Sequence, residues 1–161
     1  KSLLDLYCGV GSIGICASEY ASEIVGIEIV EEAVENARKN AMLNQVENAR
    51  YYAGPCEELL SGVLKDFTPD VVILDPPRGG ADAAALSALI DKSPPRIVYV
   101  SCNPTTLARD LKQLIANGYT LEKVSIVDMF PYTTSVECIA LLQRGRSTMP
   151  SAAPTKGVER E

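Results

Sequence analysis

The sequence contains no histidine among its 161 residues. Within this chain a catalytic Cys–His or Ser–His–Asp arrangement and a histidine-ligated metal are excluded, so any nucleophile must be activated without imidazole. The chain also has no C-x-x-C spacing, because its five cysteines stand at positions 8, 16, 56, 102 and 138. An odd number of widely spaced cysteines argues against a disulfide framework or a zinc site and favours a reducing compartment.

Positive charge and long apolar segments are scarce as well. Lys and Arg number 15 against 21 Asp and Glu, which leaves a net charge of −6. Binding nucleic acid by electrostatics alone requires a concentrated basic surface, so this charge argues against a domain of that kind. It does not exclude a catalytic domain whose RNA-binding part lies elsewhere in a longer chain. The longest apolar runs have the length of strands, and there is no signal peptide. We therefore expect a cytoplasmic protein without membrane contact.

What the sequence does contain is a regular alternation of short apolar runs with longer helical patterns. This alternation is typical of a parallel sheet covered by helices on both faces. We predict strands at 2–8, 23–29, 49–54, 70–74, 96–102, 119–130 and 136–144, with helices starting near 12, 31, 56, 83 and 104. Residues 1–144 are expected to form one domain, cut from a larger protein because its first strand begins almost at residue 1. Residues 145–161 are small, polar and Pro-containing, which predicts a disordered tail.

The stretch "CGVGSIG" places Gly9, Gly11 and Gly14 in G-x-G-x-x-G spacing between a predicted strand and a predicted helix. Glycines here let a ligand approach the backbone and aim a helix N-terminus at it, and Ser12 is a candidate cap for that helix. Glu28, at the end of the next strand, suits the two hydroxyls of a ribose. The pattern predicts a dinucleotide or S-adenosylmethionine site. The alternative is a tight turn without a ligand.

The stretch "DPPRGG" follows the fourth predicted strand, so Asp75 stands at the carboxyl edge of the sheet, where open α/β sheets bind ligands. Two consecutive prolines fix an extended turn without backbone donors and hold the aspartate toward the cleft. A dehydrogenase has no particular need for this loop, which counts against a nicotinamide cofactor. The alternative is a rigid connection with a solvated aspartate.

Cys102 ends the fifth predicted strand, directly before a helix that Asn103 and Pro104 open. The positive end of that helix favours a thiolate, so a nucleophile competes with the interpretation as an ordinary buried cysteine. Glu137 begins the last predicted strand. If this strand is antiparallel and inserted beside the fifth, Glu137 faces Cys102 across the cleft, with Asp75 one strand further over. The alternative for Glu137 is a solvated residue at a strand end.

Four segments, "DLYCGVGSIGI", "DPPRGG", "VYVSCNPTTLARDL" and "DMFPYTTSVE", together resemble the RNA (uracil-5-)-methyltransferase family, whose members form 5-methyluridine in transfer and ribosomal RNA. The similarity runs from about Leu3 to Leu142, and the pairing of "SCNP" with the late "FP-x-T…E" is specific. The resemblance implies a Rossmann-like class I methyltransferase fold: a mostly parallel, doubly wound α/β sheet with an antiparallel last strand. It also implies S-adenosylmethionine as the cofactor and residues 1–144 as the catalytic domain.

The resemblance further assigns roles to positions: Cys102 is the nucleophile, Glu137 is the base, and Tyr7, Ser12, Glu28 and Asp75 line the S-adenosylmethionine pocket. The pair Pro55-Cys56 replaces a polar residue that often approaches the adenine. "SCNPTTLARDL" and "DMFP" are most similar to the bacterial large-subunit branch, which implies ribosomal RNA rather than transfer RNA as the substrate. The family's N-terminal RNA-binding domain is missing from this chain, and we expect RNA affinity to reside there.

Other activities compete with this interpretation. A cytosine-5 RNA methyltransferase also forms a covalent bond between a cysteine and the target base. It carries a second cysteine in the loop whose sequence here is "DPPR". An amino-group methyltransferase also uses an Asp/Asn-Pro-Pro loop, but it needs neither Cys102 nor Glu137. A nucleotide-binding oxidoreductase could use "GVGSIG", and tight NAD binding would support it. A binding domain that has lost activity is the remaining alternative.

Overall fold

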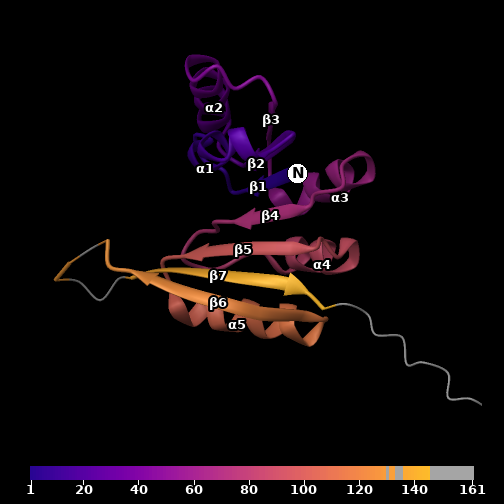
Figure 1. The fold of residues 1–161 in the computed structure, drawn as a ribbon, viewed down its shortest axis with the longest axis vertical. Helices are drawn as coiled ribbons and strands as arrows, with labels where there is room; N and C mark the ends of the chain where they lie inside the picture. The colour runs from indigo at the N-terminus through magenta and orange to yellow at the C-terminus, as the bar shows by residue number, and fades with distance from the viewer. Residues whose placement is uncertain (130, 133–135, 146–161) are drawn as a thin grey trace, which may run out of the picture.

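Seven strands build a single sheet in the structure, a computed structural model that describes residues 1–129, 131–132 and 136–145. They are β1 (Ser2–Leu6), β2 (Glu23–Glu28), β3 (Ala49–Ala53), β4 (Val71–Leu74), β5 (Arg96–Ser101), β6 (Tyr119–Val127) and β7 (Glu137–Arg144). Their order across the sheet is β3-β2-β1-β4-β5-β7-β6 (Figure 1). Neighbouring strands are parallel except at β7, which is antiparallel to both β5 and β6. The predicted α/β sheet with an antiparallel last strand beside the fifth is confirmed.

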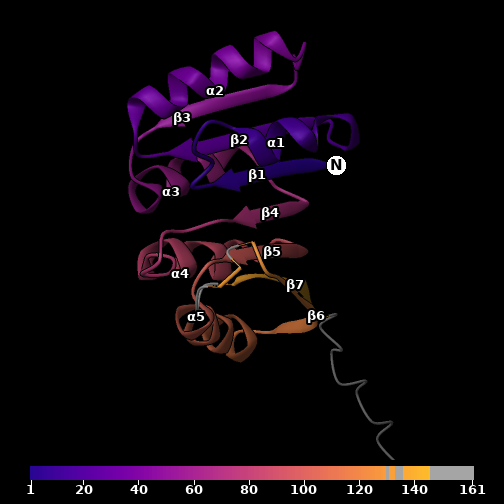
Figure 2. The same cartoon turned by 90° about the vertical axis from the view of Figure 1, so that its left-hand side faces the viewer.

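Helices cover both faces of this sheet. They are α1 (Ser12–Cys16), α2 (Glu31–Leu43), α3 (Cys56–Asp66), α4 (Ala83–Lys92) and α5 (Pro104–Ala116), and a turn of 3-10 helix at Ser18–Tyr20 follows α1. Helices α3, α4 and α5 pack side by side on one face, whereas α1 and α2 lie on the other (Figures 1 and 2). None of the helices in the described part of the chain combines the length and the hydrophobicity that a membrane crossing demands.

The larger core lies between the sheet and the α3–α4–α5 layer. Alternate residues of β5 point into it, so that Ile97 and Tyr99 are fully buried while their neighbours are partly exposed. Each helix contributes leucines spaced three or four residues apart, as Leu107, Leu111 and Leu114 do from α5. Burial of these apolar side chains is the main free-energy term that holds the layers together.

Local predictions differ from the structure at several element ends, such as that of the sixth strand, which was expected to reach residue 130 and ends at Val127. The first strand ends at Leu6 rather than at residue 8, because Tyr7 turns out of the β region with a φ of 62°. Ser12 does not cap α1: it is the first helical residue, and Gly11 takes the cap position without a side-chain hydrogen bond. The long helix expected after Ser12 stops at Cys16 and continues only as the 3-10 turn. The predicted tail, apart from Gly145, lies outside the described residues.

The topology brings the carboxyl ends of β1, β2, β4 and β5 to one edge of the sheet, where β7 begins (Figure 1). Loops from these strand ends meet there because parallel strands all end on the same side. Every residue predicted to bind a ligand or to act in catalysis ends or follows one of these four strands, or begins β7. This edge is therefore the place to examine for a site.

Candidate active site

Three predicted ligand-binding residues form a row at this edge. Strands β2, β1 and β4 run in register up to their last pairs, and the next residue of each segment is Glu28, Tyr7 or Asp75. These three line one cavity of about 370 Å³, together with Ile29, Pro55, Cys56, Glu57 and Pro77. The volume lies within the usual range of small-molecule sites, about 300–1,000 Å³. Pro55 and Cys56, which interrupt the family's usual polar contact, are part of the cavity wall.

Glu28 holds the loop after β1 in place. One carboxylate oxygen, Oε2, accepts a hydrogen bond from the backbone N–H of Gly9 (3.0 Å), and the other, Oε1, accepts one from the N–H of Val30 (2.9 Å). Glu28 is buried, with only 9% of the residue exposed to solvent. Each oxygen has a second lone pair, and the residue lines the cavity, so the carboxylate can also accept hydrogen bonds from a ligand's hydroxyl groups.

The glycine loop rests on buried polar side chains. Gly11 has a φ of 80°, and a Cβ on it would lie 2.9 Å from the hydroxyl oxygen of Tyr51, so both its backbone and its surroundings require glycine. The Gly14 N–H donates to Oδ2 of Asp5 (3.1 Å), which is completely buried. Burial raises the pKa of Asp5 to about 7, against the lowering effect of the Gly14 hydrogen bond. The loop geometry thus depends on an aspartate that titrates near neutral pH.

Of the predicted glycine-loop residues, Gly9 meets Glu28 directly, whereas Ser12 is exposed at the start of α1. Neither Ser12 nor Gly11 belongs to the wall of the cavity that contains Glu28. The structure therefore brings Tyr7, Glu28 and Asp75 together and places the loop residues beside them.

Tyr7 connects the cavity to the loop after β4. Its positive φ is rare for an aromatic residue and marks a locally strained turn of the kind found at functional sites. The Tyr7 hydroxyl accepts a hydrogen bond from the N–H of Asp82 (3.2 Å), the residue that caps α4. Burial raises the pKa of Tyr7 to about 12, so the phenol stays protonated near neutral pH.

Asp75 lies close enough to Glu137 for the charge of Glu137 to act on it. Burial raises the pKa of Asp75, and the negative charge of Glu137 raises it further. Glu137 belongs to β7 and Asp75 follows β4, with β5 between these strands. Two carboxyl groups therefore lie at the carboxyl edge, one on each side of β5, and the charge of Glu137 acts on Asp75.

The register of β5 with β7, continued by one step beyond its last pair, places Cys102 opposite Glu137. Ser101 pairs with Cys138 in antiparallel register, and one step further toward the edge stand Cys102 and Glu137. Both are half-buried. Because the strands are antiparallel, this step brings the end of β5 beside the start of β7. The last strand is thus antiparallel and lies beside the fifth, which is the condition under which the sequence predicted Glu137 near Cys102.

The turn around Cys102 is tightly bonded. The Asn103 N–H donates to Oγ of Ser101 (3.1 Å), and the Asn103 side chain accepts from the N–H of Thr105 (3.1 Å), which makes it the cap of α5. Cys102 therefore stands immediately before the N-terminus of a helix, where the backbone dipoles favour negative charge. The other cysteines differ in setting: Cys8, Cys56 and Cys138 are buried, and Cys16 is exposed at the end of α1.

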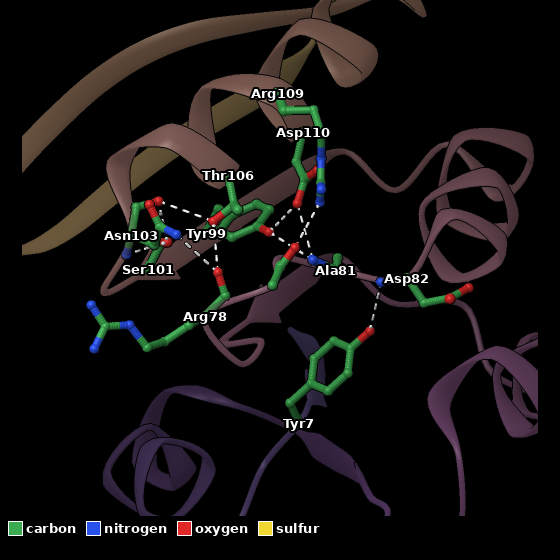
Figure 3. Close-up of polar contacts among 11 residues, drawn as sticks. Tyr7, Arg78, Ala81, Asp82, Tyr99, Ser101, Asn103, Thr106, Arg109 and Asp110 are labelled. Atoms are coloured by element: carbon green, nitrogen blue, oxygen red, sulfur yellow. Dashed lines mark hydrogen bonds and ion pairs between the residues drawn. The ribbon is translucent and has the colours of Figure 1, made fainter.

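Sequence reasoning missed a polar cluster behind this edge, shown in Figure 3. Asp110 of α5 is 1% exposed and binds Tyr99 of β5, Arg109 and the backbone of Ala81. A signal was present, because Asp110 occupies a position in the helix period that otherwise carries leucine. A charged residue in an apolar stripe must find partners on folding, and that pattern could have identified it.

An α/β sheet with an antiparallel strand inserted between β5 and β6, and with a ligand cavity at its carboxyl edge, defines the class of Rossmann-like methyltransferases. Within this class, the family model described as tRNA (Uracil-5-)-methyltransferase matches residues 1–145. The chain belongs to this family.

Individual relatives agree with this assignment. An uncharacterized RNA methyltransferase of Bacillus cereus is 47% identical over 145 residues, which cover 89% of this chain and 32% of the relative. One of Clostridium tetani is 49% identical over 144 residues, 89% of this chain and 31% of the relative. The chain thus spans about a third of the length of these curated relatives.

A solved structure extends the likeness to three dimensions. It is the Pyrococcus abyssi tRNA (uracil-54, C5)-methyltransferase in complex with S-adenosyl-L-homocysteine, with a TM-score of 0.75 and 36% sequence identity. The superposition covers 87% of this chain and 33% of the other.

Proposed function

We propose that this domain transfers a methyl group from S-adenosylmethionine to carbon 5 of a uridine in RNA, with Cys102 as nucleophile and Glu137 as base. The observation that carries the proposal is the edge geometry: one side holds a ligand cavity with Glu28, and the other holds Cys102 beside Glu137. Membership in the uracil-5 family supports the reaction type.

The cavity fits S-adenosylmethionine. Glu28 supplies a buried carboxylate with lone pairs for the ribose hydroxyls, as acids at the end of the second strand do in related folds. Ile29, Pro55 and Pro77 supply apolar walls that suit an adenine ring and the methionine chain. When bound, this molecule supplies an electrophilic methyl group on a sulfonium, which carbon 5 of the activated uracil takes.

The protein's own residues make carbon 5 reactive and then release the product. Carbon 5 of uracil is a poor nucleophile, and addition of the Cys102 thiolate to carbon 6 forms an S–C6 bond that turns carbon 5 into an enolate-like centre. After methylation, Glu137 removes the proton from carbon 5. The electron pair of that C–H bond reforms the C5–C6 double bond, and the S–C6 bond breaks to return the thiolate.

We further propose ribosomal RNA as the substrate, on the likeness of "SCNPTTLARDL" and "DMFP" to the large-subunit branch. RNA affinity is supplied by parts of the protein that correspond to the two thirds of the relatives outside the match. A net charge of −6 supports this division, because a domain of that charge cannot grip RNA by electrostatics alone. Preferential methylation of transfer RNA over ribosomal RNA by the whole protein would overturn the choice of substrate.

The reaction is tested by intact-protein mass spectrometry after incubation with S-adenosylmethionine and an RNA that contains 5-fluorouridine. Fluorine at carbon 5 cannot leave as a proton does, so a covalent adduct that carries one methyl group should accumulate. The adduct should be absent in Cys102→Ala and retained in Cys16→Ala, which removes an exposed cysteine elsewhere.

No adduct from protein that binds both S-adenosylmethionine and the RNA would refute the uracil-5 proposal. An adduct with 5-fluorocytidine RNA instead would favour the cytosine-5 alternative.

A further inference from the structure

The loop between β4 and α4, residues 75–82, is bonded to α5 and its cap through residues 78, 79 and 81 (Figure 3). The carbonyl of Arg78 accepts hydrogen bonds from Nδ2 of Asn103 (3.0 Å) and from Oγ1 of Thr106 (3.2 Å). The carbonyl of Gly79 accepts one from Nη2 of Arg109 (3.0 Å). These contacts attach the middle of the loop to the first turns of the helix that begins just after Cys102.

Asp110 forms the centre of this attachment. Its Oδ2 accepts from the Tyr99 hydroxyl (2.5 Å) and from the Ala81 N–H (3.0 Å), and its Oδ1 accepts from Nε of Arg109 (2.8 Å). Both oxygens therefore have partners, as a carboxylate this deeply buried requires. The Tyr99 hydroxyl also receives the Ala81 N–H (3.1 Å), so the three groups form a closed triangle.

Gly80 shows how closely the loop approaches the helix. Its φ is +86°, and a Cβ built on it would lie 2.6 Å from Oδ2 of Asp110 and would collide with the Arg109 guanidinium. The loop can pass over the carboxylate only because this position has no side chain. The close approach of the loop to α5 therefore requires a glycine at position 80 wherever Asp110 occupies its buried position.

The same loop also forms part of the ligand cavity. It begins at Asp75, Pro77 belongs to the cavity wall, and the N–H of Asp82 donates to the Tyr7 hydroxyl. Through this loop, the cavity wall is linked to the helix whose cap follows Cys102. Four residues of the loop carry these bonds: residues 78, 79 and 81 to the side of Asn103 and α5, and residue 82 to Tyr7 in the cavity wall.

We propose that Asp110 and Tyr99 are positioning residues for methyl transfer: by holding Ala81 directly, and Gly79 through Arg109, they set the distance between the cofactor cavity and Cys102. This inference rests on the proposed function and assigns roles to residues outside the wall of the cavity that contains Glu28. The physical reason is that reacting groups must be held to a fraction of an ångström, and a displacement of about 1 Å can cost 10²-fold in rate. A loop with two adjacent glycines cannot supply that accuracy without external bonds.

The test uses Asp110→Asn and Tyr99→Phe in the whole protein. Each variant keeps the shape of the side chain and removes the charge or the hydroxyl that completes the triangle. Asp91→Asn, an exposed aspartate of α4, is the matched control. Three quantities are measured below the melting temperature of every variant: amide hydrogen exchange of residues 79–82, the Kd for S-adenosylmethionine, and the single-turnover rate of RNA methylation.

We expect exchange of residues 79–82 to rise at least about tenfold and the methylation rate to fall about 10- to 100-fold, with the Kd for S-adenosylmethionine changed less than about threefold. A purely structural role would lower the melting temperature but leave the rate constant of the folded fraction intact. That result, or unchanged exchange, would overturn the inference.

The outcome is separable from that of the proposed function. An inactive wild type that binds both substrates refutes the proposed function, whereas an active wild type matched by equally active variants refutes only the positioning role.

Discussion

The two halves of the carboxyl edge are built in different ways. In the half formed by β1 and β2, the glycine loop is held by Glu28 and Asp5, carboxylates that lie 19 and 9 residues from the amides they bind. In the half formed by β4, β5 and β7, the loop amides and carbonyls find partners 25 to 30 residues away on α5. The glycine loop is held within the consecutive segment β1–α1–β2, whereas the loop after β4 is held only once α5 has packed beside it. After their proposed roles, the first is called the cofactor half and the second the nucleophile half.

The buried aspartates of the two halves show the same contrast. Asp110 has a partner on each oxygen, one of them the Arg109 cation. Asp5 uses Oδ2 alone, since Oδ1 has no hydrogen-bond partner among the described residues. Burial raises the pKa of Asp5 to about 7. The halves should therefore respond differently to mutation and to pH.

The largest effect is expected from Glu137→Gln in the nucleophile half. Loss of the base should slow methylation about 10²- to 10⁴-fold, because Cys102 is expelled only after the carbon 5 proton is removed. A methylated adduct should then accumulate on ordinary uridine RNA and be visible by mass spectrometry. The same change should lower the pKa of Asp75, since a negative neighbour is removed.

The control for that variant is Glu122→Gln, an exposed glutamate of β6. Equal turnover of Glu137→Gln and this control would show that the carboxylate beside Cys102 is not the base.

A smaller effect, on stability, is expected from Asp5→Asn in the cofactor half. The folded pKa of about 7 lies above the ordinary value of 3.8, so the stabilising contribution of Asp5 is complete below about pH 4 and is lost as the pH rises toward 7. Asparagine still accepts from the Gly14 N–H but does not titrate, so it should remove this part of the pH dependence, at most roughly 4 kcal/mol.

Urea unfolding of wild type and variant at pH 5 and pH 8 measures the effect. The difference in free energy of unfolding should favour Asp5→Asn more at pH 8 than at pH 5, with unchanged m-values. Parallel curves at the two pH values would contradict a titrating Asp5.

The smallest effect is expected from Glu28→Gln. Glutamine places an amide N–H₂ against one of two backbone N–H groups, at Gly9 or Val30, and loses the charge. Cofactor affinity should fall roughly 10- to 100-fold, the worth of a hydrogen bond to a charged group. Isothermal titration with S-adenosylmethionine checks this, with Glu31→Gln at the exposed start of α2 as the control. Equal affinities of the two variants for S-adenosylmethionine would show that Glu28 does not bind the cofactor.

Local signals predicted much of the fold and part of the site. The alternation of apolar runs predicted all the strands and helices in order, because burial on a sheet or helix face imposes its period on the sequence. The glycine loop, the last residue of β2 and the residue after β4 were selected as candidate ligand-binding residues because they stand at strand ends, where loops carry function. Ser12 was misjudged as a cap, since a glycine with a positive φ already starts α1.

The sequence by itself determined the order of elements, the residue types at each strand end, and a thiol before a helix cap, all set by chemistry among near neighbours in the chain. Tertiary structure alone decided that Glu137 stands beside Cys102 and that Asp110 binds the loop after β4. These pairs are distant in sequence, and each depends on strand insertion or helix packing. Hydrophobic burial drives that packing, but it does not specify which polar groups will meet when it is complete.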